Sequence, residues 1–511
     1  MKPLSLHDML PTSVSKQSMR RIIMLILIMF MCAVDVSPHT LRHSHFQNRA
    51  AALRQEALAA VPPSSYNPEN VFLTTSPRWL NQTLDHFSPQ ESVRFPQRFF
   101  EFLDYFDAPN GPIFLIIWGE STCYGILNDY IAVLAKRFGA ALVSLEHRYY
   151  GFSSPFQDLK IENLKYLNSK QALSDLAAFR NHYQALINTR YKRSSNVDNL
   201  WFTFGGSYAG ALSAWFRLKF PHLAHGSLAS SAPIHALEDY YEYDEQVAKS
   251  VGPECANALR ELKDLVGYHM KTDAKYMKSF FGAKSIEDDN DFLSLLADST
   301  AAAVQYGFQD VLCKPLVRSY SKKKDILATY RDFVNHTIFF EFGIQPMDYN
   351  REKMRNSTQM DSNSGSRQWT YQYCTEFGFF QTAPNRNSIR FTELNMKYYL
   401  DLCSYIFGKG TIPKTSETNL YYGGDNIAGT KIIFTNGSQD PWRHASKTNS
   451  TNNELAILIE CQNCAHCVDL NGCPQFPFNP QGDGELCHPR YSIQKARETI
   501  ETIMESWIIN H

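Results

Sequence analysis

The chain has 511 residues, of which 50 are Lys or Arg and 51 are Asp or Glu, giving a formal net charge of -1. This balance excludes a global electrostatic field that would draw the chain to nucleic acid or to an anionic membrane. Hydrophobic residues make up 44% of the chain and charged residues 20%. That composition excludes global disorder and predicts a packed globular protein.

An apolar run near the N-terminus indicates export from the cytosol. Arg20 and Arg21 precede residues 22–34, which carry no charged side chain, and Asp35 ends the run. The run is shorter than the roughly 20 residues that span a bilayer, and a basic flank before it is typical of a secretory signal. We therefore expect a signal peptide over residues 1–36, with an uncleaved signal anchor as the alternative, and a leader or propeptide over residues 37–77.

The cysteine count agrees with export. Of 11 cysteines, Cys32 lies in the apolar run, and the remaining ten are an even number that suits disulfides in an oxidising compartment. A group near residue 465 has a spacing that would also suit zinc: Cys461, Cys464, His466, Cys467 and Cys473. In an oxidising compartment disulfides are the favoured interpretation, and we expect no metal and no cofactor.

Short apolar runs bounded by turn residues predict strands that are buried on both faces of a sheet. They lie at residues 113–118, 140–145, 200–204, 431–435 and 455–459. Helical patterns at 129–138 and 174–186 separate the earlier runs, an alternation typical of an α/β protein with a parallel sheet.

The middle of the chain differs from the two ends. Over residues 237–367 the strand pattern gives way to helical spacing, which predicts an inserted helical cap, with an independent domain as the alternative. The core would then consist of residues 78–236 and 368–511. We expect the cap to cover the cleft at the carboxyl ends of the strands, where open α/β sheets bind ligands.

Ser207 has the sequence context of a nucleophile. It follows the apolar run 200–204 and precedes a helical pattern at 211–220, which is the strand, turn, serine and helix order of a nucleophile elbow. The tight turn requires small residues two places before and two places after the serine, and Gly205 and Ala209 meet this requirement. We therefore predict that Ser207 is catalytic, with an ordinary loop serine as the alternative.

A serine nucleophile requires a base and an orienting acid. Asp440 follows the predicted strand 431–435, and His466 follows the predicted strand 455–459, so both lie on loops at carboxyl ends. Of the other histidines nearby, His444 shares its loop with Asp440, and His488 lies farther along the chain. The order Ser207, Asp440, His466 is the one expected for this type of fold.

Five sequons are exposed to glycosylation if the chain is exported. We expect modification at four of them, Asn81, Asn335, Asn356 and Asn449. We expect Asn436 to be unmodified, because a glycan four residues before Asp440 would crowd the site.

Several separated motifs resemble one family. They are Trp79-x-x-Gln82-x-Leu84-Asp85-His86-Phe87, Glu146-His147-Arg148-Tyr149-Tyr150-Gly151, Phe204-Gly-Gly-Ser-Tyr-Ala-Gly210, Ser230-Ser-Ala-Pro233, Trp369-x-Tyr-Gln-x-Cys374-Thr-Glu376-Phe-Gly378, Asn436-Gly437-x-x-Asp440-Pro441-Trp442 and His466-Cys-Val-Asp469. In this order and density they resemble the serine peptidase family of lysosomal prolyl carboxypeptidase and dipeptidyl peptidase II, over residues 78–507.

The resemblance implies an α/β-hydrolase fold with an inserted helical cap domain, a triad of Ser207, Asp440 and His466, and exopeptidase activity near proline. It also implies an oxyanion hole built from the backbone amides of Tyr208 and Gly119. Here the chain departs from its relatives, because Trp118-Gly-Glu-Ser-Thr-Cys123 replaces a Gly-rich stretch. Loss of one oxyanion donor lowers the rate by on the order of a hundredfold.

Other residues of these motifs have two interpretations. We expect Glu146, His147 and Arg148 to brace the site through a buried ion pair, and Asp85 and His86 to be structural. Four aromatic residues are predicted either to line a pocket for a ring such as proline or to pack in the core. They are Trp369, Phe379, Phe380 and Trp442.

The leading hypothesis is a lumenal or secreted serine exopeptidase, with peptides as substrates and with no nucleic-acid partner and no membrane in the mature form. An esterase or lipase on the same fold, and a binding protein on a disabled hydrolase scaffold, are the alternatives. The resemblance adds the lysosome or endosome to the extracellular space as expected locations. The sequence leaves open whether the end pocket recognises a carboxylate or an amine, and whether the chain forms a homodimer.

Overall fold

The computed structural model describes residues 72–472, apart from 89 and 91, and residues 490–510. The expected signal peptide and residues 37–71 of the expected leader lie outside these ranges. The last part of that leader contains strand β1 (Phe72–Thr74), which pairs antiparallel with β5 (Ile126–Leu127). Within the described ranges, no helix has the length and apolarity that crossing a membrane requires.

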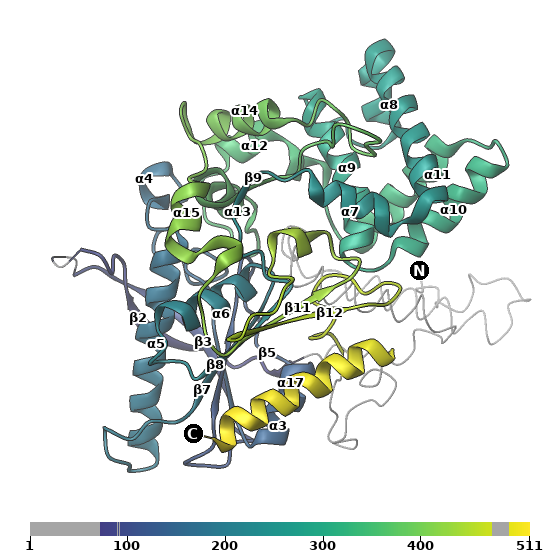
Figure 1. The fold of residues 1–511 in the computed structure, drawn as a ribbon. Coiled ribbons are helices and arrows are strands. Elements are labelled where there is room, and N and C mark those ends of the chain that lie inside the picture. The colour runs from purple at the N-terminus through teal and green to yellow at the C-terminus, as the bar shows by residue number, and fades with distance from the viewer. Residues whose placement is uncertain (1–71, 89, 91, 473–489, 511) are drawn as a thin grey trace, which may run out of the picture. The chain divides into compact units, whose positions relative to one another are not determined.

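The centre of the fold is a mixed sheet, in the order β12-β11-β8-β7-β4-β6-β3-β2 among the described residues (Figure 1). All neighbours from β12 to β6 run parallel, and β3 and β2 join at one edge as antiparallel strands. The five predicted strands are present. The strands are β2 (Arg78–Thr83), β3 (Arg94–Phe102), β4 (Ile113–Ile117), β6 (Ala141–Leu145), β7 (Trp201–Gly206), β8 (Gly226–Ser230), β11 (Ile432–Gly437) and β12 (Glu454–Ile459).

Helices cover both faces of the sheet, because successive side chains of each buried strand point to opposite faces. Phe114 and Phe202 pack on the face covered by α3 (Tyr130–Phe138) and α17 (Tyr491–Ile509). Leu115 and Trp201 pack on the other face, against α5 (Ser169–Arg190) and α6 (Tyr208–Lys219). This three-layer arrangement is the α/β-hydrolase fold.

A long helical insertion separates β8 from β11, and we call it the cap. It also contains a parallel pair of short strands, β9 (Leu237–Asp239) and β10 (Gly378–Phe380). Residues 368–431, assigned from the sequence to the second part of the core, contribute no strand to the large sheet within the described chain. The helices are α7 (Glu242–Ser250), α8 (Gly252–Phe280), α9 (Asp289–Gln305), α10 (Gln309–Ser321), α11 (Ile326–Phe333), α12 (Arg351–Asn356), α13 (Ser366–Gln372), α14 (Met396–Phe407) and α15 (Thr415–Tyr422).

The expected disulfides are present in part. Cys255–Cys313 joins α8 to α10, Cys374–Cys403 reaches α14, and Cys461–Cys464 follows β12. Within the described ranges, Cys123 and Cys467 are buried free thiols. The described disulfides therefore lie in the cap and in the loop after β12, and two described cysteines stay unpaired.

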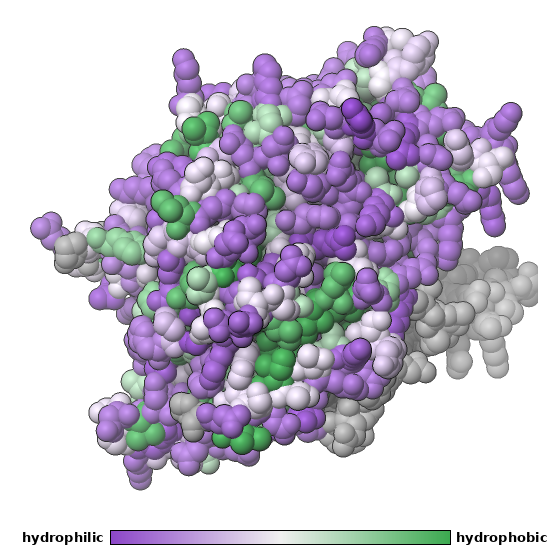
Figure 2. Space-filling view, viewed as in Figure 1, coloured by the Kyte–Doolittle hydropathy of each residue, from purple (hydrophilic) through white to green (hydrophobic). Residues whose placement is uncertain are grey.

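The surface in Figure 2 is mostly hydrophilic, with an apolar patch in the region of β12. β12 is the edge strand of the described sheet, and its Leu458 is 43% exposed. The alternation that buries Ile459 therefore turns its neighbour Leu458 outward.

A buried ion pair joins α5 to the loop after β6. Arg148 donates from Nε and Nη2 to the two oxygens of Asp175, each at 2.6 Å, and His86 Nε2 lies 2.8 Å from Asp175 Oδ1. Burial opposes ionisation of Asp175, but Arg148 and His86 outweigh it and lower the pKa of this carboxyl. The structure thus places His86 in a structural network rather than beside Ser207.

Replacing Asp175 by Asn is expected to lower the free energy of unfolding by about 3–5 kcal/mol, because Arg148 would remain buried without a counter-charge. Urea unfolding measures the change. The matched control is Asp198→Asn, because Asp198 pairs with Arg180 and its own side chain is 52% exposed. We expect a loss below about 1 kcal/mol there, and equal losses for both variants would contradict the structural role of Asp175.

The sequons differ in exposure. Asn81, Asn356 and Asn449 are exposed and Asn335 is partly exposed, whereas Asn436 is 2% exposed and donates from Nδ2 to the carbonyl of Lys447. Glycopeptide mapping of protein secreted by a eukaryotic host is expected to find glycans at the first four sites and none at Asn436. A glycan on Asn436 of folded protein would contradict this placement.

Candidate active site

Ser207 lies on a strained turn between β7 and α6. Its φ of 60° and ψ of -133° are sparsely populated for a residue other than glycine, and strain of this kind clusters at functional sites. The turn requires glycine at position 205, because a Cβ there would lie 2.1 Å from the carbonyl oxygen of Ala209. The elbow predicted from the sequence is therefore present, and the serine is 8% exposed.

Asp440 and His466 form a buried pair on the loops after β11 and β12. His466 Nδ1 lies 2.9 Å from Asp440 Oδ2, and the two side chains are 1% and 0% exposed. Burial alone would lower the pKa of His466, but the Asp440 carboxylate outweighs it and raises this pKa well above its usual value. The other ring nitrogen, Nε2, is buried and has no hydrogen-bond partner among the described residues.

The serine and histidine loops lie against each other. A Cβ built on Gly206 would approach Cys467 Sγ to 2.9 Å, so the neighbours of Ser207 and His466 in the chain are in contact. The amide of Cys467 also donates to Ser231 Oγ at 2.8 Å, and the amide of Ser207 donates to the carbonyl of Ser230 at 2.9 Å. The structure therefore places the three predicted residues at the carboxyl ends of the parallel strands.

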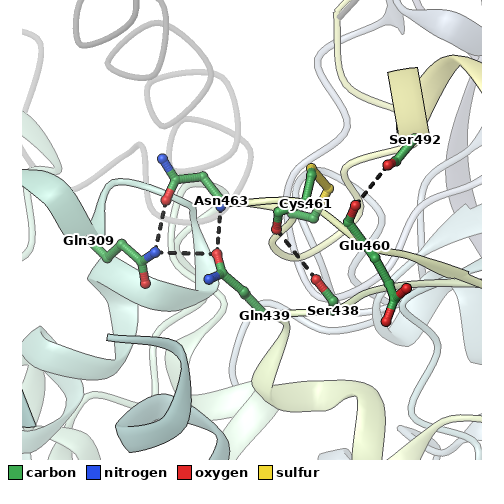
Figure 3. The surroundings of a disulfide bond; sticks show 8 residues. Gln309, Ser438, Gln439, Glu460, Cys461, Asn463 and Ser492 are labelled. Atoms are coloured by element: carbon green, nitrogen blue, oxygen red, sulfur yellow. Dashed lines mark hydrogen bonds between the residues drawn. A yellow bond between two sulfur atoms is a disulfide. The ribbon is translucent and has the colours of Figure 1, made fainter. Parts of the chain in front are cut away.

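A disulfide and an amide cluster hold the acid and base loops together (Figure 3). Gln309 of the cap donates from Nε2 to Asn463 Oδ1 at 2.9 Å and to Gln439 Oε1 at 3.2 Å. The amide of Asn463 donates to the same Gln439 oxygen at 2.5 Å, between the bonded Cys461 and Cys464. Since Gln439 immediately precedes Asp440, the cap fixes both loops at once.

Gln305, at the end of α9, makes a second connection from the cap. Its carbonyl accepts the backbone amide of His466 at 3.0 Å. Its side-chain oxygen accepts the indole N–H of Trp442 at 3.1 Å and the hydroxyl of Tyr243 at 2.6 Å. No sequence motif pointed to Gln305 or Gln309, because their contacts with the loops after β11 and β12 join residues at least 130 positions apart.

A buried carboxylate joins the strands beneath the histidine loop. Asp469 accepts the hydroxyls of Ser230 at 2.5 Å and of Thr435 at 2.8 Å, which end β8 and lie in β11. Burial raises the pKa of Asp469 despite these two donors. Two of the sequence motifs, at 230–233 and 466–469, thus meet in this contact.

The loop after β4 places Gly119 beside the start of α6. A Cβ on Gly119 would lie 3.2 Å from the amide nitrogen of Ala209, so its backbone packs against the turn that carries Ser207. The amide of Cys123 donates to Glu146 Oε1 at 2.9 Å, and Arg98 Nη2 donates to the same oxygen at 2.6 Å. This loop, which departs from the Gly-rich pattern, is therefore held in place by a buried ion pair.

Tyr208, the first residue of α6, is anchored through its side chain. His147 Nδ1 lies 2.7 Å from the carbonyl of Arg148, so that nitrogen donates, and Nε2 accepts the Tyr208 hydroxyl at 3.1 Å. Burial lowers the pKa of His147 to about 4, which keeps the ring neutral. The Tyr208 hydroxyl in turn accepts Gln372 Nε2 at 2.9 Å. The backbone N–H of Tyr208 belongs to the first turn and has no partner within the helix.

A cavity of about 250 Å³ lies within the cap, and Trp442 of the loop after β11 contributes to its wall. Trp442 lines it and lies 6.4 Å from the His466 ring, and Trp369 lines it and lies 5.5 Å from the Tyr208 ring, centre to centre. Phe379, with a positive φ of 57°, and Phe380 also contribute to its wall. The four aromatic residues considered from the sequence thus line one cavity.

Metal ligands are not gathered anywhere in the described ranges, where no three His, Cys, Asp or Glu side chains lie as a metal site requires. Cys461 and Cys464, considered above as zinc ligands, are bonded to each other.

The chain matches the family model described as serine carboxypeptidase S28 over residues 82–476. It is 50% identical over 438 residues to probable serine protease EDA2 of Arabidopsis thaliana, covering 86% of this chain and 89% of that protein. It is 30% identical over 466 residues to human thymus-specific serine protease, covering 84% and 86%. It is 28% identical over 450 residues to human lysosomal Pro-X carboxypeptidase, covering 82% and 88%.

With its serine on a strand-to-helix elbow and a match over most of its length, the chain belongs to the S28 family of serine peptidases.

Proposed function

We propose that the protein is a serine exopeptidase of the secretory pathway that cleaves peptides near proline, with Ser207, Asp440 and His466 as its catalytic triad. The observation that carries the proposal is the buried 2.9 Å pair of His466 and Asp440, which leaves His466 Nε2 without a hydrogen-bond partner in the described chain, on a loop whose Cys467 packs against the turn of the strained Ser207. A base in this arrangement activates a serine hydroxyl.

In this mechanism, Ser207 Oγ attacks the scissile carbonyl carbon while His466 Nε2 accepts the hydroxyl proton. Asp440 accepts a hydrogen bond from Nδ1–H of His466, which fixes the tautomer and stabilises the imidazolium. His466 then protonates the departing amine, and the first product leaves with an acyl group remaining on Ser207. Water, deprotonated by His466, attacks this ester and regenerates the serine.

The developing oxyanion requires donors that are fixed before the reaction. The backbone N–H groups of Tyr208 and Gly119 supply them in this proposal. His147 holds the Tyr208 side chain, and Glu146 holds the loop that carries Gly119. The altered loop sequence therefore retains a donor, because the amide of Gly119 belongs to the backbone.

The aromatic cavity supports the proline preference, because Trp442, Trp369 and Phe379 offer flat apolar surface for a pyrrolidine ring, and the Trp442 ring lies 6.4 Å from the His466 ring, centre to centre. The cap contacts the loops of Asp440 and His466 through Gln309 and Gln305, which supports restricted access and action on chain ends. The described disulfides and the lysosomal location named for a relative support a lumenal, lysosomal or extracellular site of action.

A fluorophosphonate probe is expected to label the secreted protein at Ser207 alone. Ser207→Ala should abolish labelling, and Asp440→Asn should slow it by on the order of 10⁴-fold, because it removes the charge that orients His466. Mass spectrometry of the labelled peptide identifies the site. Ser194→Ala, an exposed serine on a loop, is the matched control and should label like the unmodified protein. Absence of labelling in folded protein would refute the enzyme assignment.

Proline at the cleavage position is expected to raise kcat/KM by at least about tenfold over alanine, because stacking against Trp442 and Trp369 adds affinity in an apolar pocket. Paired peptides that differ only at this residue, followed by chromatography, give the ratio. Equal rates for both peptides would argue against a proline pocket, and hydrolysis of p-nitrophenyl esters without hydrolysis of either peptide would favour an esterase.

A further inference from the structure

The Asp440 carboxylate binds more than the histidine. Its Oδ2 lies 2.9 Å from His466 Nδ1, and its other oxygen, Oδ1, accepts the backbone amide of Trp442 at 2.9 Å. This second bond is the N-cap of the short helix η8 (Pro441–Ala445), which begins directly after Asp440. Each oxygen of the acid therefore has a donor, and the orientation of the carboxylate depends on Trp442 as well as on His466.

Gln305, at the end of α9 in the cap, contacts the two donors of Asp440. Its side-chain oxygen accepts the indole N–H of Trp442 at 3.1 Å, and its backbone carbonyl accepts the backbone amide of His466 at 3.0 Å. Four hydrogen bonds therefore join four residues in a closed ring, which we call the hydrogen-bonded ring. The four residues are Gln305, Trp442, Asp440 and His466.

The hydrogen-bonded ring is largely shielded from water, because Gln305, Asp440 and His466 are buried. The side-chain oxygen of Gln305 also accepts the Tyr243 hydroxyl at 2.6 Å, so two donors fix the orientation of this amide. Where water is excluded, a lost hydrogen bond leaves its partner unsatisfied, and bonds that share groups depend on one another. Opening the ring at Gln305 would therefore disturb the acid and base as well.

The acid and the base particularly need such a connection because they lie on two different loops. Asp440 follows β11 and His466 follows β12, and loops are more mobile than the strands that carry them. A displacement of a catalytic group by about 1 Å can lower the rate by on the order of 100-fold. Gln305 binds both loops, one through its side chain and the other through its backbone.

We propose that Gln305 is a positioning residue of the triad, which makes the cap a part of the active site and not only a barrier around it. Gln305 acts through Trp442 and His466 rather than on the reacting atoms. Helix α9 then stays docked on both loops during turnover, because lifting it would break two bonds of the ring. This inference rests on the proposed function, in which His466 is the base that activates Ser207.

Gln305→Met tests the proposal, because methionine is similar in length but offers no oxygen to the Trp442 indole. The rate at which a fluorophosphonate probe labels Ser207 is expected to fall by on the order of 10–100-fold, since His466 loses its fixed position. Gln305→Glu keeps an acceptor oxygen and should recover most of the lost rate. A Met variant that labels as fast as the unmodified protein would overturn the proposal, as would a Glu variant that labels as slowly as the Met variant.

Gln184 of α5 offers a matched control. It is buried, and its side-chain oxygen likewise accepts an indole N–H, that of Trp201 at 2.8 Å. Trp201 begins β7, whereas Ser207 follows the opposite end of that strand. Gln184→Met should lower the urea midpoint of unfolding as Gln305→Met does, because both changes remove the acceptor of an indole, but it should leave the labelling rate unchanged. Equal slowing of labelling by both variants would reduce Gln305 to a structural role.

A double-mutant cycle tests whether the ring acts as a unit. Trp442→Phe opens the same bond from its other end. Combining it with Gln305→Met should therefore slow labelling no further than the slower of the two single variants does. Slowing by the product of the two single effects would show that the residues act independently and would contradict the ring.

Proton NMR of the free protein gives a readout that does not require catalysis. The Nδ1 proton of His466 is expected to resonate far downfield of the backbone amides and to exchange slowly with water, because it is buried in the bond to Asp440. Absence of this resonance from His466→Gln assigns it. Gln305→Met should speed its exchange and Gln184→Met should not, and equal protection in both variants would overturn the inference. Labelling of the unmodified protein decides the proposed function separately, so each idea can fail alone.

Discussion

The parallel register of four strands is the constraint on which the site depends. β7, β8, β11 and β12 are paired so that Gly206 lies opposite Ser230, Ser230 opposite Thr435, and Gly437 opposite Ile459. The carboxyl ends of these strands therefore lie side by side, and the loops that follow neighbouring strands begin close to one another. Ser207, Asp440 and His466 converge because strand pairing brings them there, although 259 positions separate the first from the last.

Buried ion pairs also fix the loops around the site. Ion pairs occur beyond the pair of Asp440 and His466. Arg98 and Glu146 form one under the loop of Gly119, and Arg148 and Asp175 form another near His147. Desolvation makes such pairs costly unless every donor and acceptor is matched, so each one tolerates few alternative geometries. A buried ion pair that allows few geometries suits a site where a backbone amide must point at an oxyanion, because small displacements of the donor lower the rate.

Local pattern predicted five strands of the central sheet, whereas β8 and the contacts between distant elements could not be predicted from it. The elbow at Ser207 and the loops of Asp440 and His466 follow from apolar runs and small residues, which are features of neighbours in sequence. β8 was missed because Gly226 and Ser227 weaken its apolar signal. The buried ion-pair cluster of the cap leaves no trace in sequence, since Asp244, Asp298 and Arg390 come from separate elements and only packing brings them together.

The disulfide between Cys461 and Cys464 makes the geometry of the site depend on the compartment in which the chain folds. It closes a ring within the loop that delivers His466, next to the amides that hold Gln439. Thiols stay reduced in the cytosol, so a copy of the chain that remained there would fold with this ring open and the loop of His466 less firmly held. A copy of the chain in the cytosol would therefore have lower peptidase activity. Production in bacteria would require export to the oxidising periplasm, or refolding in a mixture of reduced and oxidised thiol.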